Sequence, residues 1–350
     1  MENEGLSVGV KPEEGAGGMS ALAGIEAWSE ERLVEFASSA VYVRPLEPYP
    51  GWQFDADWDN PGSSFVARRR IWEVFRDRAL DGVVEIEWHG GLRIGLHLRN
   101  EFGKQIFVGG AIDPNEFSFL DRLLRKGMTF ADVGANEGLY TVFAAQRVGS
   151  GGRVWAFEPS RRERARLLRN LERNGLTNVE IIACALAERD GEARLSVAHE
   201  EHSGHNTLGR FVYRDVELEG EEVVPVRSLD SAAAERGIER IDVVKVDIEG
   251  AEEAFLTGAR QTLMAMRPVI LLELTDLSLR AQNSSAGEVL GHLGAMNYRI
   301  LVFDRRTGVP VPADNLRRNW DENVIAWPAE RPVPDSLLAP AASAGRQAGR

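Results

Sequence analysis

The sequence has 350 residues, a formal net charge of -13 at pH 7 and a single cysteine, Cys184. A chain of this length is expected to form one large domain with an extension, and its negative charge argues against a nucleic acid or an anionic membrane as partner. One cysteine excludes an internal disulfide, which fits the reducing cytoplasm. The first residues lack the basic and apolar regions of a signal peptide, and no apolar run reaches transmembrane length.

The N-terminal third is expected to be an extension that precedes the main domain. Residues 1–19 are rich in Gly and Glu without periodicity, which predicts disorder. Apolar residues at helical spacing predict two helices, over 20–40 and 64–80, and alternating apolar residues predict a β-hairpin over 83–98. These elements make up a unit at 20–112. The apolar stripe of the first helix could meet a membrane or a partner, but its acidic flanks favour docking on the main domain.

The main domain is expected over 113–328. A helix over 113–126 leads into its first strand, and strands then alternate with helices, which predicts a parallel sheet covered on both faces. The strands are expected at 129–133, 153–157, 179–184, 241–246, 268–274, 298–303 and 323–327. The remaining residues, 329–350, are rich in Pro, Ala and Gly and are expected to form a disordered tail.

A long insertion, about 193–227, separates the third and fourth strands. Residues 193–198 and 222–227 alternate like strands and enclose a charged segment that contains several glycines. Loops of this length are usually lids or disordered. The insertion leaves the carboxyl edge of the sheet, where open α/β sheets bind their ligands, so we expect a mobile lid over the site.

The expected ligand site is centred on residues 129–139, TFADVGANEGL. The first strand ends in Asp132 and turns through Gly134, Asn136 and Gly138 into a helix. Such a turn lets backbone N–H groups approach a ligand, and the helix N-terminus adds partial positive charge, whereas Asp132 supplies negative charge. The amino-acid end of S-adenosylmethionine carries both signs and suits this pair. The spacing departs from the G-x-G-x-x-G pattern of nicotinamide dinucleotide sites.

A second carboxylate is expected beside this turn. The next strand, RVWAFEP (153–159), closes on Glu158 about twenty residues past the turn. An acidic residue at this place in an α/β sheet commonly binds a ribose diol, in NAD and in S-adenosylmethionine alike. The alternative, a helix-capping or solvated acid, is less favoured because Pro159 and Ser160 form the turn behind it.

The sequence resembles the FkbM family of S-adenosylmethionine-dependent methyltransferases. The resemblance covers about 116–298 and rests on six blocks in the family's order: DVGANEGLYT (132–141), GRVWAFEPS (152–160), NLERNGLTNV (170–179), SLD (228–230), VVKVDIEGAE (243–252) and RPVILLE (267–273). It implies a class I methyltransferase fold, a Rossmann-like seven-stranded sheet with one antiparallel strand, and usually O-methylation of a hydroxyl. By position it also implies adenine contacts from the backbone at Ala185. Glu116 is implied to border the cofactor, with capping of its helix as an equal alternative.

The candidate catalytic residues are His205, Asp247 and Glu249. His199, His202 and His205 lie at three-residue spacing on the insertion, where solvated loop histidines are the most favoured interpretation, a catalytic base the second and a zinc site the third. Asp247 and Glu249 end the fourth strand, facing the expected cofactor sulfur, and Lys245 shares a face with Asp247 and is expected to pair with an acid. With Glu252 the two acids could bind Mg²⁺, but acids near a helix start more often interact with its dipole, so no metal is expected.

These observations predict a cytoplasmic class I methyltransferase. The expected acceptor is a hydroxyl of a sugar, glycolipid or polyketide-type small molecule, with Asp247 orienting it and His205 as base. An NAD(P)-dependent oxidoreductase is the alternative enzyme. A catalytically inactive cofactor-binding module is a third possibility, against which the intact acids Asp132, Glu158 and Asp247 argue.

Overall fold

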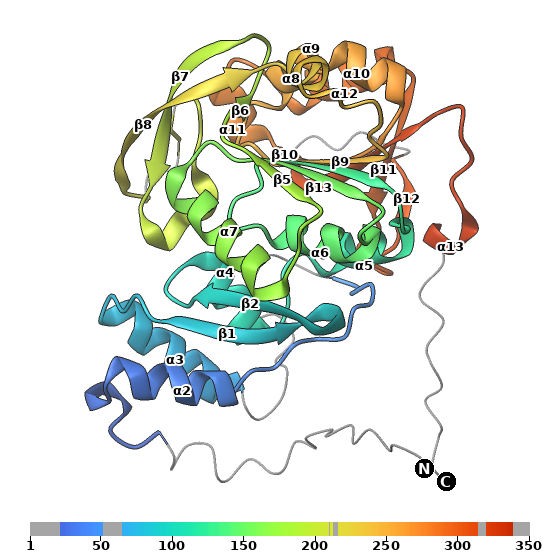
Figure 1. The fold of residues 1–350 in the computed structure, drawn as a ribbon. Coiled ribbons are helices and arrows are strands. Elements are labelled where there is room, and N and C mark those ends of the chain that lie inside the picture. Colours follow the sequence, from blue (N-terminus) through green and yellow to red (C-terminus); the bar gives the residue numbers. More distant parts are fainter. Residues whose placement is uncertain (1–21, 52–64, 210, 213–215, 314–319, 339–350) are drawn as a thin grey trace, which may run out of the picture.

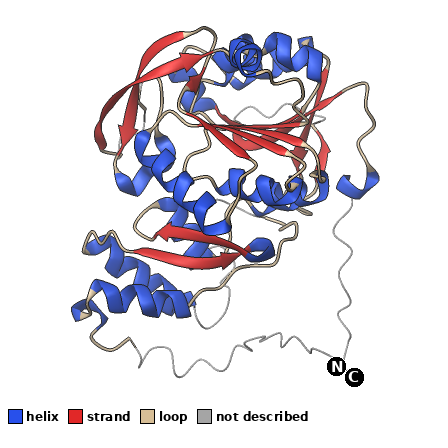
Figure 2. Cartoon of the chain, in the orientation of Figure 1, coloured by secondary structure: helices blue, strands red, loops and turns tan. Residues whose placement is uncertain are grey.

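The computed structural model describes residues 22–51, 65–209, 211–212, 216–313 and 320–338, and every structural statement below concerns these ranges. At its centre is an eight-stranded sheet with helices on both faces (Figures 1 and 2). The strand order is β12-β11-β13-β10-β9-β3-β4-β5. The strands are β3 (Thr129–Val133), β4 (Arg153–Phe157), β5 (Val179–Ile182), β9 (Val243–Val246), β10 (Val269–Thr275), β11 (Tyr298–Phe303), β12 (Pro310–Pro312) and β13 (Asp321–Pro328).

The sheet is mixed, as expected, but it has one strand more than predicted. Strands β5, β4, β3, β9 and β10 run parallel, whereas β13 lies antiparallel between β10 and β11. The additional strand is β12, which pairs with the edge of β11. Its sequence, Pro-Val-Pro, carries little strand signal because prolines are confined to edge strands, so the sequence pattern missed it.

Two layers of helices enclose the sheet. One face is covered by α5 (Pro114–Leu123), α6 (Leu139–Val148) and α7 (Arg161–Asn174). The other carries α8 (Leu229–Arg236), α9 (Glu252–Gly258), α10 (Arg260–Met266), α11 (Asp276–Ala281) and α12 (Ala286–Ala295). Successive strand residues point to opposite faces, so Phe130 and its neighbour Ala131 are both fully buried but belong to two different apolar clusters.

The N-terminal elements form a further layer against α6 and α7 (Figure 1). They are η1 (Ile25–Ala27), α2 (Glu30–Ser39), α3 (Phe65–Asp77), β1 (Val83–Trp88), η2 (His89–Gly91) and β2 (Leu92–His97), followed by α4 (Glu101–Gly103) and η3 (Lys104–Gly109). The predicted hairpin is confirmed, and His89 begins its turn. One apolar cluster contains Leu33 and Ile94 of this layer together with Val142 of α6, so the layer shares its core with the main domain.

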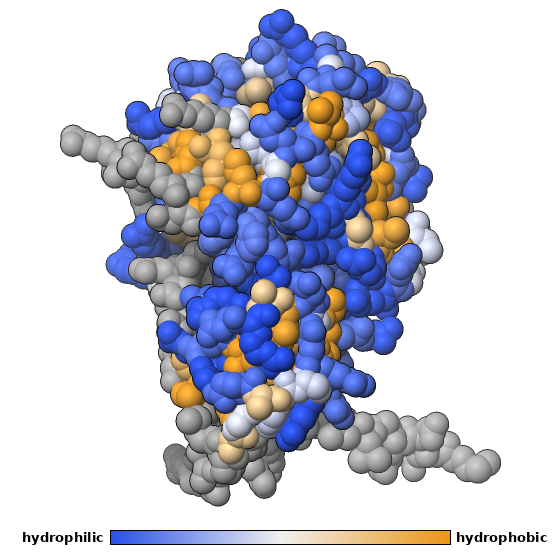
Figure 3. Space-filling view, turned by 90° about the vertical axis from the view of Figure 1, so that its left-hand side faces the viewer, coloured by the Kyte–Doolittle hydropathy of each residue, from blue (hydrophilic) through white to orange (hydrophobic). Residues whose placement is uncertain are grey.

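The insertion forms a small sheet of its own. Strands β7 (Gly191–Ala198) and β8 (Leu218–Arg227) pair antiparallel, and β6 (Ala185–Leu186) joins β8. Leu195, Val197 and Val224 form the centre of a separate apolar cluster. The two predicted strands are therefore confirmed, and they carry most of the buried side chains of this cluster. Figure 3 shows this side of the molecule as mostly hydrophilic, with some apolar patches.

The predicted disordered tail is wrong for its first part. Residues 335–338 form α13 (Asp335–Leu338), which packs on α5. Leu337 is 1% exposed, and Arg122 of α5 donates a hydrogen bond to the carbonyl oxygen of Ser336 at 3.2 Å. A four-residue helix shows no measurable periodicity, which explains the error. The remainder of the predicted tail and the predicted disordered start lie outside the described residues. None of the described helices has the length and apolar character needed to cross a membrane.

Candidate active site

A cavity of about 940 Å³ lies at the carboxyl ends of β3, β4, β9 and β10. Its wall is built from the turns that follow these strands, from the start of α5 and from the insertion. Predicted site residues that line it are Glu116, Gly134, Asn136, Glu158, Ala185, His205, Asp247 and Glu249. Most of the residues singled out in the sequence are therefore brought together in one place.

The turn after β3 is shaped by close contacts with neighbouring loops. Gly134 has φ 80° and Gly138 has φ 88°. A Cβ atom at Gly134 would lie 1.9 Å from the backbone oxygen of Asp247, and one at Gly138 would lie 2.2 Å from Leu167 Cδ1. The two glycines are thus required by the packing of this turn on the β9 turn and of α6 on α7. Gly138 does not line the cavity, so its predicted cofactor contact has no support from the cavity wall.

Glu158 is buried, with both carboxylate oxygens aligned by backbone groups. Oε2 accepts a hydrogen bond from the N–H of Asn136 and Oε1 one from the N–H of Ser160, each at 2.8 Å. Burial raises the pKa of Glu158 to about 8, and the nearby Glu163 carboxylate adds to the effect. Each oxygen retains a lone pair. Glu158 lines the cavity and therefore fits the predicted role of ribose acceptor.

The structure separates the two other acids predicted to contact the cofactor. Asp132 is 1% exposed, accepts a hydrogen bond from Thr141 Oγ1 at 2.5 Å and does not line the cavity. Glu116 lines it, and its Oε2 is buried without a hydrogen-bond partner among the described residues. Burial raises the pKa of Glu116 to about 8, with Asp113 as the next contribution. Of these two acids only Glu116 lines the cavity, whereas Asp132 is hydrogen-bonded to Thr141 of α6.

An apolar part of the wall suits a flat ring. Ala185 lines the cavity together with Phe157, Leu186 and Leu195. Ala185 belongs to β6, so it is held by pairing with Val226 of β8 and not by the main sheet. Backbone contacts from Ala185 to adenine stay a prediction that this position permits.

On another side of the cavity, four ionisable groups form one network. Lys245 Nζ lies 3.1 Å from Asp247 Oδ2, which confirms the expected pairing, and 4.9 Å from the centre of the Tyr140 ring. Burial acts to raise the pKa of Asp247, but the Lys245 ammonium and the hydrogen bonds from Glu273 and Lys245 together outweigh it and hold that pKa below its usual value. The Asp247 charge, burial and the hydrogen bond to Asp247 raise the pKa of Glu273 well above its usual range. Tyr140 and Glu273 line the cavity and were not found from the sequence, because only packing reveals them.

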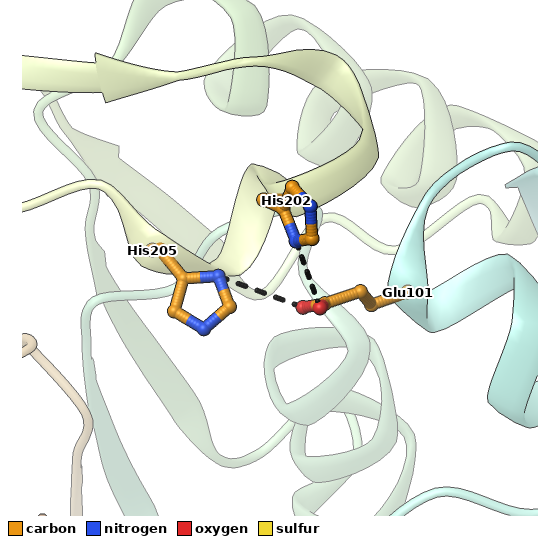
Figure 4. Close-up of side chains that lie close together, drawn as sticks. All are labelled: Glu101, His202 and His205. Carbon is orange, nitrogen blue, oxygen red and sulfur yellow. Dashed lines mark hydrogen bonds and ion pairs between the residues drawn. The ribbon is translucent and has the colours of Figure 1, made fainter. Parts of the chain in front are cut away.

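The histidine segment lies beside this network and is joined to α7 by an ion pair. It forms η4 (Glu200–His205), and Arg166 of α7 pairs with both Glu200 and Glu137. His205 lines the cavity, and burial lowers its pKa. His202 and His205 approach Glu101 of α4 (Figure 4). Glu101 lies about a hundred positions earlier in the sequence, so no local pattern predicts this contact.

Glu249 and Glu252 have different partners. Glu249 lines the cavity, its carbonyl oxygen accepts a hydrogen bond from Thr207 Oγ1 at 3.0 Å, and its Oε2 accepts one from Ser278 Oγ at 3.3 Å. Glu252 Oε1 accepts from the backbone N–H of Gly250 at 3.1 Å and does not line the cavity. This contact at the start of α9 supports the helix-start interpretation of Glu252 over a Mg²⁺ site.

Residues 132–300 match the model of the methyltransferase FkbM domain family. The chain contains an FkbM-family methyltransferase domain. Among characterised relatives, 31-O-demethyl-FK506 methyltransferase FkbM of Streptomyces tacrolimicus is 27% identical over 51% of this chain and 75% of its own. The 2-O-methyltransferase NoeI of Sinorhizobium fredii is 28% identical over 42% of this chain and 63% of its own. The AMB antimetabolite synthetase AmbE of Pseudomonas aeruginosa is 29% identical over 41% of this chain but only 8% of its own.

Solved structures of other methyltransferases align with this chain at low TM-scores. The crystal structure of methyltransferase FkbM from Methylobacillus flagellatus aligns with a TM-score of 0.38 and 16% identity, over 78% of this chain and 62% of that one. An O-methyltransferase from Bacillus cereus in complex with S-adenosylhomocysteine aligns with a TM-score of 0.35 and 16% identity, over 62% and 81%.

The FkbM domain uses S-adenosylmethionine, and the cavity fits it. Buried Glu158 offers acceptor lone pairs for two ribose hydroxyls, and the unpartnered Glu116 Oε2 offers one for an ammonium. The family match is to methyltransferases, so the oxidoreductase alternative has no support.

Proposed function

We propose that the protein methylates a hydroxyl group of a sugar, a glycolipid or a polyketide-type small molecule. The observation that carries this proposal is the cavity, whose wall holds the buried acids Glu116 and Glu158 together with the ionisable network of Lys245, Asp247 and Glu273. Its volume, about 940 Å³, is near the upper end of the range of ligand pockets, about 300–1,000 Å³, and leaves room for an acceptor beside the cofactor. Two relatives named for O-methylation of a polyketide-type compound and of a 2-hydroxyl support the acceptor class.

The cofactor side is assigned to the residues with unused acceptor capacity. Glu158 would accept the ribose hydroxyls, and Glu116 would accept from the ammonium. Asn136, whose backbone N–H binds Glu158, would position that carboxylate, and Asp132 would fix the turn through Thr141. S-adenosylmethionine, when bound, supplies an electrophilic methyl group.

The acceptor side is assigned to His205, Asp247 and Glu249. Lys245 and Glu273 keep Asp247 ionised, so Asp247 can accept a hydrogen bond from the acceptor hydroxyl and orient its oxygen. His205 faces the cavity from the insertion, and Glu249 from the turn after β9. Methyl transfer is an in-line displacement, and orientation of the reacting groups can supply roughly 7–11 kcal/mol of its barrier. The main work of these side chains is therefore alignment.

The proposal is tested by turnover on matched acceptors. The full chain would be incubated with S-adenosylmethionine and a panel of hydroxylated sugars and macrolides, each paired with the analogue that lacks the hydroxyl. We expect S-adenosylhomocysteine and a methylated product from the hydroxylated member of a pair only. Loss of one orienting hydrogen bond in Asp247→Asn should lower turnover about tenfold, whereas Glu192→Gln, an exposed residue of β7, should not change it. Product from amine or thiol acceptors alone, or full turnover by Asp247→Asn, would contradict the proposal.

A further inference from the structure

Three metal-ligating side chains meet at the edge of the cavity. Glu101 comes from α4, and His202 and His205 come from η4. Their candidate ligand atoms all lie within 4.8 Å of one another. His202 Nδ1 lies 2.9 Å from Glu101 Oε1, and His205 Nδ1 lies 3.6 Å from Glu101 Oε2 (Figure 4). Figure 4 shows both imidazole Nδ1 atoms turned toward the same carboxylate.

We propose that Glu101, His202 and His205 form a binding site for a divalent transition-metal ion such as Zn²⁺. Two imidazole nitrogens and one carboxylate are the ligand set of open zinc sites, which keep a position for water or substrate. Mg²⁺ and Ca²⁺ prefer oxygen ligands throughout, so this set selects against them. The proposal concerns metal binding and does not depend on the acceptor proposed above.

The two segments that carry the ligands are fixed relative to each other by buried hydrogen bonds. Asn100, 1% exposed, accepts a bond from the Gly103 N–H at 2.7 Å and donates one to Ser203 Oγ at 3.3 Å. Ser203 is fully buried, and its carbonyl oxygen accepts a bond from Asn136 Nδ2 at 3.0 Å. Asn100 precedes Glu101, and Ser203 lies between the two histidines. The backbone positions of all three ligands are thus set before any ion arrives, which reduces the ordering cost of binding.

The cluster is open to an ion and to the cavity. The side chains of Glu101, His202 and His205 are 34%, 30% and 20% exposed, so an ion can reach them from solvent. Glu101 and His205 also line the cavity. A bound ion would therefore present its open position to an oxygen of the acceptor, and His205 would act as a ligand, in place of the base suggested by its sequence position.

The test is direct metal binding by tag-free protein that has been freed of metal with a chelator. Calorimetric titration with ZnCl₂ should show that the wild type binds one ion per chain. Co²⁺ bound in place of Zn²⁺ should give the visible absorption bands of a four- or five-coordinate site with nitrogen and oxygen ligands. Glu101→Gln and His202→Ala should each weaken Zn²⁺ binding by at least about 10–100-fold. Mutation of residues that only hydrogen-bond to metal ligands already causes a loss of this size. His199→Ala is the matched control, because His199 lies on the same insertion outside the cluster. It should bind Zn²⁺ as the wild type does.

Two further measurements keep the result decisive. Thermal melting in chelator should show the variants folded as the wild type, and S-adenosylhomocysteine binding by His202→Ala should be retained because His202 does not line the cavity. If His202→Ala fails to fold, the nearly isosteric Glu101→Gln decides. The proposal is overturned if the wild type takes up no stoichiometric Zn²⁺, if Glu101→Gln binds as tightly as the wild type, or if His199→Ala loses as much affinity as the ligand variants. In those cases the contact between Glu101 and His202 is a hydrogen bond within the protein and not part of a metal site.

Discussion

At the scale of single residues, Glu158 links cofactor binding to pH. Its carboxyl group has a pKa of about 8 in the free protein, against a usual 4.5, so it is mostly protonated at pH 7. In the unfolded chain the Glu158 carboxyl group loses its proton near pH 4.5, whereas in the folded protein it keeps the proton until about pH 8. The free energy of unfolding therefore decreases as pH rises from about 4.5 to 8. Hydroxyl donors favour the ionised form, so binding of the ribose should lower this pKa and release a proton.

This proton is measurable by calorimetry with S-adenosylhomocysteine at pH 7 in two buffers of different ionisation enthalpy. The binding heats in the two buffers should differ because the buffer takes up the released proton. We expect a difference that corresponds to the release of up to about one proton per bound ligand. Glu158→Gln should remove most of that difference, and any proton released by Glu116 would remain in the variant. Equal heats in both buffers for the wild type would show that Glu158 does not ionise on binding.

Gly134 is the residue whose replacement should most disturb the cofactor turn. Its positive φ costs other residues about 1–2 kcal/mol, and a Cβ atom would also meet the backbone oxygen of Asp247. We expect Gly134→Ala to lower the free energy of unfolding by more than about 2 kcal/mol in urea denaturation. Gly151→Ala, where a Cβ meets nothing within 4 Å, should change it by less than about 0.5 kcal/mol. Similar stabilities of the two variants would refute this account of the turn.

At the scale of elements, α13 joins the C-terminal segment to the helix that carries Glu116. Leu337 is 1% exposed and its neighbour Leu338 is 37% exposed. Replacing a buried leucine by alanine typically lowers the free energy of unfolding by about 2–5 kcal/mol. A terminal helix can detach locally, so we expect Leu337→Ala to cost about 2 kcal/mol, the low end of this range. Leu338→Ala should cost less than about 0.5 kcal/mol. Equal urea midpoints for the two variants would mean that α13 does not hold this position in solution.

The elements that could be predicted from sequence are those with a strong local pattern. Strands β3, β4 and β11 match their predicted bounds because each is an apolar run ended by a turn residue or a carboxylate. β12 and α13 were missed because a three-residue strand with two prolines and a four-residue helix have no periodicity to detect. The sequence predicts a mobile lid at the insertion, but alternation within each strand does not reveal that β7 pairs with β8 and that this pairing creates an apolar cluster.

At the scale of the whole molecule, the residues proposed to bind the cofactor can be predicted from local sequence. The ionisable network around Asp247 and the cluster of Glu101, His202 and His205 cannot. Glu158 and Gly134 lie in short motifs at strand ends, where the fold places them on the cavity wall. Glu101 approaches His202 and His205 only because the N-terminal layer packs against the main domain and places α4 beside η4. The same layer shares one apolar cluster with the main domain, so the predicted boundary at 112 is not a break in the core.

The central claim is that the cavity at the carboxyl edge of the sheet binds S-adenosylmethionine through Glu158. The most direct test is the affinity of the full chain for S-adenosylhomocysteine, measured by calorimetry for the wild type, Glu158→Ala and the exposed control Glu172→Ala. Loss of the acceptor for two ribose hydroxyls should cost about 1–3 kcal/mol, a weakening of about 5–150-fold in Glu158→Ala, with Glu172→Ala unchanged. Wild-type affinity in Glu158→Ala, or no binding by the wild type, would contradict the claim.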